Sequence, residues 1–313
     1  MKVRSPTSGP ASGDHARAGA AGVVLAGGRS SRMGTPKACL EWHGSTLLYR
    51  AAALLRRTVT GPVVVVLGAE DLASPLRTPS VSSHPVDGVR SAAKGCEVGL
   101  GAAFALPALP AGVTVVQDPT PGLGPLQGIA AGLAAIRTAA GVAADVAFVC
   151  ATDMPFLHPA FVRAVLAALT DDVALPVARG HRQPLAAAYR VGLAASVAAL
   201  LAEGGRTPGE LFARSRVRVL DDAALRADAD VARLDPGLES LTNVNTPAEY
   251  AAARARPPAA VVVERAGVRR TVQAATLAHA VGSDLGSSVL LNGVEVDPDP
   301  GLPLVTGDTL VLR

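Results

Sequence analysis

The stretch VVLAGGRSSRMGTPKACL, from Val23 to Leu40, joins an apolar run to a glycine-rich turn that carries two cations. Residues 21–26 are short and apolar and end at two glycines, which predicts a buried strand and its turn. Because glycine has no Cβ, such a turn lets backbone N–H groups face an anion. Arg32 and Lys37 add positive charge to the same loop. The stretch therefore predicts a polyphosphate site, although a glycine turn with surface cations fits the spacing equally well.

The rest of the chain predicts an α/β fold, because apolar runs alternate with helical patterns. We expect strands at 21–26, 62–67, 113–117, 145–151 and 173–177, and helices at 46–58, 126–140 and 159–169. This alternation is typical of a mainly parallel sheet with right-handed crossovers. Ligands of such sheets bind at the carboxyl ends of the strands, where Gly27, Asp118 and Asp153 fall.

Two carboxylates follow predicted strands directly. Asp153 lies in CATDMPFL, and a hard cation such as Mg²⁺ takes carboxylate and phosphate oxygens. Taken alone, Asp153 fits a role in capping a helix or stabilising a turn better, since both are common uses of aspartate. Asp118 has the same two interpretations, and the glycines and prolines after it predict a rigid loop.

Composition excludes several classes of protein. The 313 residues are 49% apolar and 3% aromatic, with a net charge of +3 and no dense Lys/Arg run, so we expect no nucleic-acid partner. Prolines interrupt the uncharged run 98–117, so we expect no membrane span. Three scattered cysteines predict neither disulfides nor zinc, and a cytoplasmic location. Five of the six histidines, His43, His84, His158, His181 and His279, show no metal-ligand spacing, so we expect them on the surface or in turns.

Breaks in composition divide the chain into three parts. Residues 1–20 are small and polar and predict a disordered tail. The α/β pattern then runs through 21–256 and closes at Pro257 and Pro258, which predict an exposed linker. Residues 259–313 follow the order β-β-α-β-β, which predicts a small mixed domain of their own.

The opening stretch also carries a resemblance. LAGGRSSRMGTPKACL resembles the signature LAGG-x-S-x-RMG-x-x-K-x-x-L of the molybdenum cofactor guanylyltransferase family, within the nucleotidyltransferase superfamily. Four further blocks match in order, namely DPTPGLGPLQGIAAGL, CATDMPFL, RQPLAAAYR and SLTNVNTPAEY. The resemblance spans about residues 21–254. It implies a Rossmann-like nucleotidyltransferase domain that transfers GMP from GTP to molybdopterin-bound molybdenum cofactor and releases pyrophosphate.

The resemblance implies that one set of residues surrounds the guanine nucleotide. The set consists of Leu25, Ala26, Gly27, Asp118, Gly124, Pro125 and Gly128. The first three would hold the nucleotide through the loop backbone, Asp118 would lie near its ribose or base, and the last three would shape the adjoining loop.

A second set is implied to act on the phosphates and the acceptor. Lys37, helped by Arg32, would contact the phosphates, and Asp153 would bind the Mg²⁺ cofactor. Asn243 and Asn245 would line the side that receives the pterin. Lys37, Arg32 and Asp153 are therefore the expected catalytic residues.

Two alternatives stay open. The tripeptide TPK before Ala38 is more typical of the sister cytidylyltransferases of molybdenum cofactor, although LAGG and GPLQGI favour guanine. The second alternative is that the protein is a non-catalytic nucleotide-binding adaptor in cofactor delivery.

The C-terminal residues carry a weaker resemblance. VLLNGVEV and GDTLVLR are similar to segments of the ubiquitin-like β-grasp sulfur carriers. Those carriers end in Gly-Gly, whereas this sequence ends in Val311-Leu312-Arg313, so we expect a docking or stabilising module. Such a module could meet cofactor-delivery or sulfur-transfer proteins.

Overall fold

The structure, a computed structural model, describes residues 19–27, 33, 36–68, 106–120, 122–138, 144–282 and 288–313. Arg32, almost all of the expected tail 1–20 and the second glycine of the opening turn lie outside these residues. So do His84 and the apolar run up to residue 105. No helix in the described ranges has the length and apolar character needed to cross a membrane.

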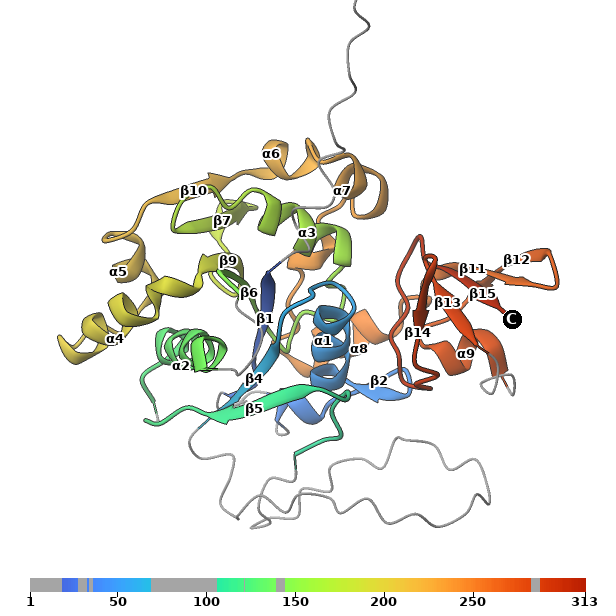
Figure 1. The fold of residues 1–313 in the computed structure, drawn as a ribbon, viewed down its shortest axis with the longest axis horizontal. Coiled ribbons are helices and arrows are strands. Elements are labelled where there is room, and N and C mark those ends of the chain that lie inside the picture. Colours follow the sequence, from blue (N-terminus) through green and yellow to red (C-terminus); the bar gives the residue numbers. More distant parts are fainter. Residues whose placement is uncertain are drawn as a thin grey trace, which may run out of the picture.

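The larger sheet is mainly parallel, as the alternation of elements predicts (Figure 1). Its strands are β1 (Ala20–Leu25), β4 (Val63–Leu67), β5 (Val113–Gln117), β6 (Val146–Ala151), β7 (Val173–Ala178), β9 (Ala186–Arg190) and β10 (Val217–Leu220). They lie in the order β10-β7-β9-β6-β1-β4-β5, with the short β8 (His181–Arg182) beside β7. Only β9 runs antiparallel to both of its neighbours on this path, β6 and β7.

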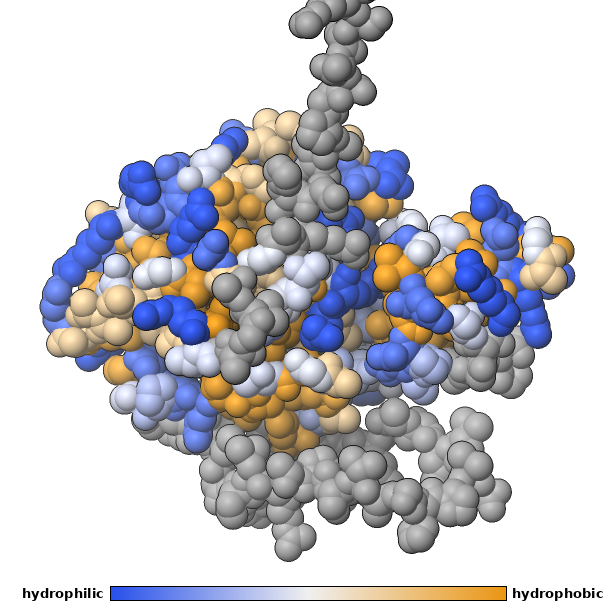
Figure 2. All heavy atoms as spheres, in the orientation of Figure 1, coloured by the Kyte–Doolittle hydropathy of each residue, from blue (hydrophilic) through white to orange (hydrophobic). Residues whose placement is uncertain are grey.

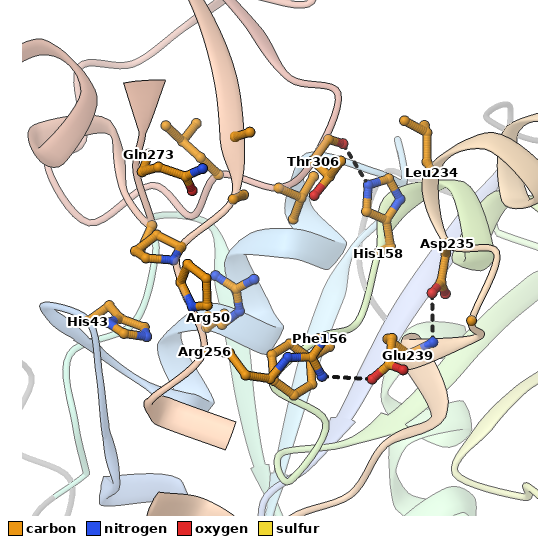
Figure 3. A pocket seen from close by; sticks show the side chains of 18 of the residues that line it. His43, Arg50, Phe156, His158, Leu234, Asp235, Glu239, Arg256, Gln273 and Thr306 are labelled. Atoms are coloured by element: carbon orange, nitrogen blue, oxygen red, sulfur yellow. Dashed lines mark hydrogen bonds and ion pairs between the residues drawn. The ribbon is translucent and has the colours of Figure 1, made fainter. Parts of the chain in front are cut away.

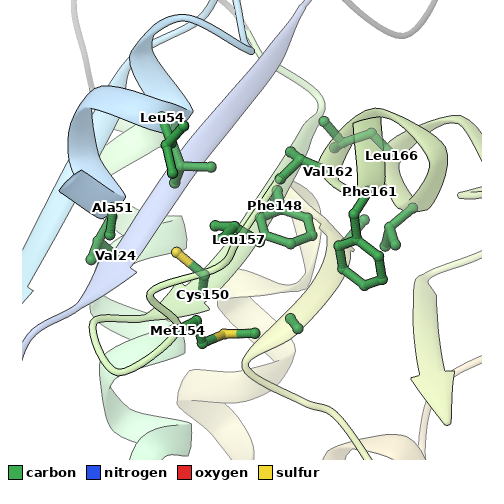
Figure 4. Close-up of a cluster of buried hydrophobic side chains, with 14 of the residues drawn as sticks. Val24, Ala51, Leu54, Phe148, Cys150, Met154, Leu157, Phe161, Val162 and Leu166 are labelled. Atoms are coloured by element: carbon green, nitrogen blue, oxygen red, sulfur yellow. The ribbon is translucent and has the colours of Figure 1, made fainter. Parts of the chain in front are cut away.

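Helices cover both faces of this sheet because its buried strands are apolar on both sides. The main ones are α1 (Leu47–Arg56), α2 (Pro125–Thr138), α3 (Pro159–Ala167) and α4 (Ala194–Ala202). In β1, Val24 faces the core with α1 and α3, whereas Val23 and Leu25 face the core with α2 and α4. Figure 4 shows the first of these cores, where aliphatic side chains of α1 and α3 surround Phe148 of β6.

The described chain also contains shorter elements that complete the larger unit. They are η1 (Lys37–Cys39), β2 (Glu41–Trp42), β3 (Ser45–Thr46), η2 (Val191–Leu193), α5 (Pro208–Phe212), α6 (Asp222–Arg226), α7 (Ala229–Leu234), η3 (Glu239–Leu241) and α8 (Pro247–Arg254). Thr246 caps α8 in a capping box with Glu249, which stabilises the start of this helix.

The C-terminal residues form a second, mixed sheet with its own apolar core. It comprises β11 (Ala260–Arg265), β12 (Val268–Gln273), α9 (Leu277–Val281), β13 (Val289–Leu291), β14 (Val294–Val296) and β15 (Thr309–Leu312). The strand order is β12-β11-β15-β13-β14, and β11 and β15 are parallel. The expected order β-β-α-β-β is wrong by one strand, because Asn292 and Gly293 turn SVLLNGVEV into a hairpin. Both residues have positive φ, which is the backbone that an Asn-Gly hairpin turn requires.

The two sheets are joined by buried polar contacts as well as by the linker. Arg57, at the end of α1, donates to both carboxylate oxygens of Asp308, at 2.9 and 2.5 Å, and to the Pro303 carbonyl at 2.7 Å. Val305 belongs to the core that lies under α1 and α3. Hydrophilic side chains are interspersed with apolar areas on the visible face of both units (Figure 2). The C-terminal sheet is therefore packed against the larger unit.

One histidine corrects an expectation. His158 is neither on the surface nor only in a turn, because it is buried and caps α3. Its Nδ1 accepts a hydrogen bond from the Ala160 N–H, while Nε2 lies 3.0 Å from the Thr306 carbonyl. This pattern fits a neutral ring whose Nε2–H donates, and burial lowers the pKa of His158 below its ordinary value.

Candidate active site

The parallel strands bring the predicted loops to one edge of the larger sheet. β1, β4 and β5 lie side by side, so the residues after them are neighbours (Figure 1). The Ala26 N–H donates to the Val66 carbonyl at 2.8 Å, and the Asp118 N–H donates to the Leu67 carbonyl at the same distance. These bonds fix the first residues of each loop at the edge of the sheet.

The backbone at this edge is tightly packed around Gly27. A Cβ on Gly27 would lie 2.5 Å from the Gly68 backbone nitrogen, so no larger side chain fits without a shift of the main chain. Leu25 is buried, Ala26 is half-buried and Gly27 is exposed, so the loop reaches the surface at Gly27. Gly68 is a site-forming residue that we did not expect from the sequence, because a lone glycine after an apolar run gives no stronger signal than an ordinary turn.

Three distant residues meet around one ammonium group. The Lys37 Nζ donates to the Asp153 Oδ2 and to the Asn245 Oδ1, each at 2.7 Å. Lys37 begins η1, Asp153 follows β6 and Asn245 precedes α8. The Val244 N–H also donates to the Asp153 carbonyl at 2.9 Å, which joins the two loops through their backbones. The Lys37 and Asp153 side chains are 20% and 14% exposed, so the pair is partly shielded from water.

The second oxygen of Asp153 supports an interpretation as a metal ligand. Asp153 Oδ1 is buried and has no hydrogen-bond partner in the described structure, although buried carboxylate oxygens normally have one. No cluster of three or more His, Cys, Asp or Glu side chains suited to a metal occurs in the described ranges. Mg²⁺ often binds through one or two carboxylates, with waters and substrate phosphates as its other ligands. A single carboxylate with one unpaired oxygen fits that mode.

Asp118 and the start of α2 form the neighbouring part of the site. The Asp118 Oδ1 accepts from the Thr120 N–H at 3.0 Å, so this residue does stabilise its turn. Burial raises the pKa of Asp118 above its ordinary value, and the hydrogen bond from Thr120 opposes that shift. Gly124 has a φ of 74°, a conformation that favours glycine, and Pro125 is the first residue of α2. Both are exposed, so the N-terminus of a 14-residue helix opens to solvent here.

Close packing of α2 on β1 supports this arrangement. A Cβ on Gly128 would lie 3.2 Å from the Leu25 side chain, and a Cβ on Gly132 would lie 2.5 Å from the Val23 Cγ1. Glycine at these positions lets the helix approach the strand that leads into the loop.

The expected acceptor residues separate in the structure. Asn245 contacts Lys37, and its N–H donates to the Glu249 Oε2 at 2.7 Å. Asn243, two residues earlier, is exposed. The contact of Asn245 with Lys37 was not expected, because the resemblance implied only a position on the pterin side.

The larger unit is similar to known proteins. The MobA-like NTP transferase domain matches residues 22–219. A "Probable molybdenum cofactor guanylyltransferase" of Pelotomaculum thermopropionicum is 31% identical over 236 residues, which cover 75% of this chain and 92% of the relative. A protein of the same name from Mycobacterium bovis is 36% identical over 189 residues, or 59% of this chain and 75% of the relative.

A solved structure shares the fold. Molybdopterin-guanine dinucleotide biosynthesis protein A from Archaeoglobus fulgidus superimposes with a TM-score of 0.50 and 20% identity, over 75% of this chain and 96% of that chain. The sequence match spans well over half of the chain and includes the loops after β1, β5 and β6. The chain therefore belongs to the MobA-like NTP transferase family, and it is a nucleotidyltransferase.

Proposed function

We propose that this protein is a molybdenum cofactor guanylyltransferase, which transfers GMP from GTP to the phosphate of molybdopterin-bound molybdenum cofactor and releases pyrophosphate. The observation that carries the proposal is the meeting of Lys37, Asp153 and Asn245 at the carboxyl edge of the sheet. The substrates in this proposal are taken from the names of the relatives, which are probable molybdenum cofactor guanylyltransferases. The sequence block GPLQGI favours guanine over cytosine.

The nucleotide lies along the loop edge in this proposal. Backbone groups of Leu25, Ala26 and Gly27 hold the guanine nucleotide, and Asp118 lies near its ribose or base. Gly124 and Pro125 leave the N-terminus of α2 open beside it, where the helix dipole favours an anion. The tight approach of Gly27 to Gly68 keeps this edge rigid, which supports accurate positioning of the α-phosphorus.

The chemistry needs no strong general base, because the attacking pterin phosphate is already an anion. Catalysis then depends on positioning and on neutralising the charge that develops on the pyrophosphate. Lys37 supplies one positive charge, and Arg32 is proposed to supply another. Asp153 would hold Mg²⁺, which when bound would supply Lewis-acid neutralisation of phosphate charge. The two oxygens of Asp153 have separate tasks, since Oδ2 orients Lys37 and Oδ1 is left for the metal.

Asn245 restricts the position of Lys37 from the opposite side. With Asp153 alone, the ammonium group could rotate around one carboxylate oxygen, whereas two acceptors at 2.7 Å fix it between two loops. Asn243 and Asn245 line the acceptor side in this proposal, and Asn245 therefore links the acceptor to the lysine.

We further propose that residues 21–256 form the nucleotidyltransferase domain and that residues 259–313 form a β-grasp-like domain. The parallel pairing of β11 with β15 in the centre of a five-stranded mixed sheet supports this assignment. The domain acts as a docking or stabilising module, and cofactor-delivery or sulfur-transfer proteins are its proposed partners. The proposed location is the cytoplasm.

A turnover assay with molybdenum cofactor as the acceptor tests the function. Pyrophosphate release is measured with each of GTP, CTP, ATP and UTP in the presence of Mg²⁺, and GTP should be the preferred donor. Asp153→Asn should abolish Mg²⁺-dependent turnover, while Asp222→Asn, which removes a half-exposed carboxylate from α6, should leave it unchanged. Both variants should keep the circular dichroism spectrum of the wild type.

Each other outcome has a defined meaning. Preference for CTP would make the enzyme a cytidylyltransferase. Nucleotide binding without turnover for any donor would favour the adaptor. An active Asp153→Asn variant would show that the metal ligand has been misassigned.

A further inference from the structure

A cavity of about 370 Å³ lies between the larger unit and the C-terminal sheet (Figure 3). Its walls come from both units, namely from the β2–β3 hairpin, α1, the loops after β6 and α7, the linker, and the residues around Thr306. Neither Lys37, Asp153 nor Asn245 lines it. The cavity is therefore separate from the proposed nucleotide site and needs both sheets for its walls.

Arg50 brings a buried positive charge to this cavity. It lies in the middle of α1, is only 8% exposed and faces the cavity. Its Nε donates to the Pro155 carbonyl at 2.7 Å, and no carboxylate of the described structure forms an ion pair with it. Burial lowers the pKa of Arg50 to about 10, so the group still carries its charge at neutral pH.

Asp308, the carboxylate whose charge acts on Arg50, is already engaged by other groups. Asp308 accepts two hydrogen bonds from Arg57, one from the Asn292 Nδ2 at 2.8 Å and one from the Val305 N–H at 2.8 Å. Its charge is therefore matched by Arg57, and the charge of Arg50 is left over.

The other charged groups around the cavity also have partners. Arg256 pairs with Glu239 at 2.8 Å and lies over the Phe156 ring, 4.1 Å from its centroid. Asp235 accepts from the backbone N–H groups of Glu239 and Ser240. Asp235 is a buried carboxylate that no ion pair joins to Arg50 in the described structure. Of the two arginines that line the cavity, Arg50 is therefore the one without a carboxylate partner among the described residues.

A buried charge of this kind is costly unless an anion pairs with it. We propose that the cavity binds a small organic molecule with a single oxyanion, a carboxylate or a phosphate monoester, whose charge pairs with the Arg50 guanidinium. The two terminal nitrogens form a fork that matches two oxyanion oxygens, because only Nε is used by the protein. The apolar part of the ligand contacts the aromatic wall formed by Trp42 and Phe156, which meet edge to face at 5.6 Å.

Trp42 provides a direct probe, since it is the one tryptophan of the chain and it lines the cavity. Its fluorescence is followed while the full chain is titrated with benzoate, phenyl phosphate or benzamide. At least one of the two anions should give a saturable change in fluorescence. The anion that binds more tightly shows whether the site prefers a carboxylate or a phosphate monoester. Benzamide has the same ring without the charge and should bind at least about tenfold more weakly.

Three variants locate the binding. Arg50→Met should weaken anion binding about 10-fold to 100-fold, the range expected for lost charge-assisted hydrogen bonds. Arg56→Met removes an exposed charge from the same helix and should leave the affinity unchanged. Lys37→Ala should also leave it unchanged, which separates this site from the nucleotide site.

The proposal is overturned if neither anion gives a saturable change in the wild type, or if benzamide binds as tightly as benzoate. It is also overturned if Lys37→Ala abolishes the signal. These comparisons remain decisive even if Arg50→Met fails to fold, and none of them uses nucleotidyl transfer as its readout.

Discussion

Removing the carboxylate of Asp308 should strongly destabilise the protein, because it leaves a buried arginine without its partner. The Arg57 and Asp308 side chains are 10% and 3% exposed, and the pair makes two direct hydrogen bonds. Breaking such a buried pair costs about 3–5 kcal/mol. Asp308→Ala should therefore lower the free energy of unfolding by that amount, which at about 2–4 °C per kcal/mol lowers Tm by roughly 6–20 °C.

Urea denaturation and a thermal scan measure this effect against a matched surface pair. Arg214 and Glu203 also form an ion pair, at 2.6 Å, but both side chains are 57% exposed. Glu203→Ala should cost at most about 1 kcal/mol, because water and salt screen exposed pairs. Equal losses for Asp308→Ala and Glu203→Ala would refute the argument from burial.

Two further variants separate the charge from the packing. The double variant Arg57→Met/Asp308→Leu should recover much of the lost stability, since apolar replacements of a buried pair leave no unpaired charge. Deleting residues 257–313 should lower Tm at least as much as Asp308→Ala while nucleotidyl transfer is kept. A folded but inactive deletion variant would show that the C-terminal sheet contributes to catalysis.

Three other predictions follow from single contacts. Lys37→Ala should weaken GTP binding about 10-fold to 100-fold but leave guanosine binding unchanged, because the lost partner is an anion; equal losses in calorimetry would place Lys37 elsewhere. Gly132→Ala should cost about 1–3 kcal/mol, since its Cβ would overlap a valine of β1, whereas Gly192→Ala meets nothing within 4 Å and should be neutral or slightly stabilising in urea denaturation. Burial lowers the pKa of His158, so the unfolded chain binds more protons and the free energy of unfolding should fall as pH drops below the ordinary pKa of 6.5. His158→Asn keeps a capping side chain and should remove this part of the pH dependence, and an unchanged pH profile would contradict it.

Much of the larger sheet could be predicted because its buried parallel strands are continuous apolar runs between turn residues. The predicted runs at 21–26 and 62–67 match β1 and β4 within one residue at each end. The aspartates after β5 and β6 were predicted for the same reason, since the alternation of elements fixes where the strands end.

β9 could not be predicted, because AAAYR has no strong preference for a strand. Residues 186–190 are extended because they pair with both β6 and β7, a tertiary effect that the local sequence does not record. The extra hairpin at Asn292 was predictable in principle, since Asn-Gly between apolar residues is a strong turn signal.

The candidate site also combines a feature that the local sequence predicts with contacts that depend on the folded chain. Sequence placed Asp153 at a strand end, but Lys37 lies 116 residues from Asp153 and 208 residues from Asn245. Only the folded chain reveals that one ammonium group contacts both. Likewise, Arg50 in LLYRAAALLR looks like an ordinary helix residue, but it is buried and lines a cavity whose walls include residues more than 200 positions later.

The contact of Arg57 with Asp308 also sets an order of events during synthesis. The two residues are 251 positions apart, so at roughly 5–20 residues per second the arginine leaves the ribosome about 10–50 s before its partner. During that interval α1 and the strands beside it can already fold, but the end of α1 still presents an unpaired cation next to an apolar surface. The nascent chain is therefore open to chaperones and proteases at this position until the C-terminal sheet closes over it.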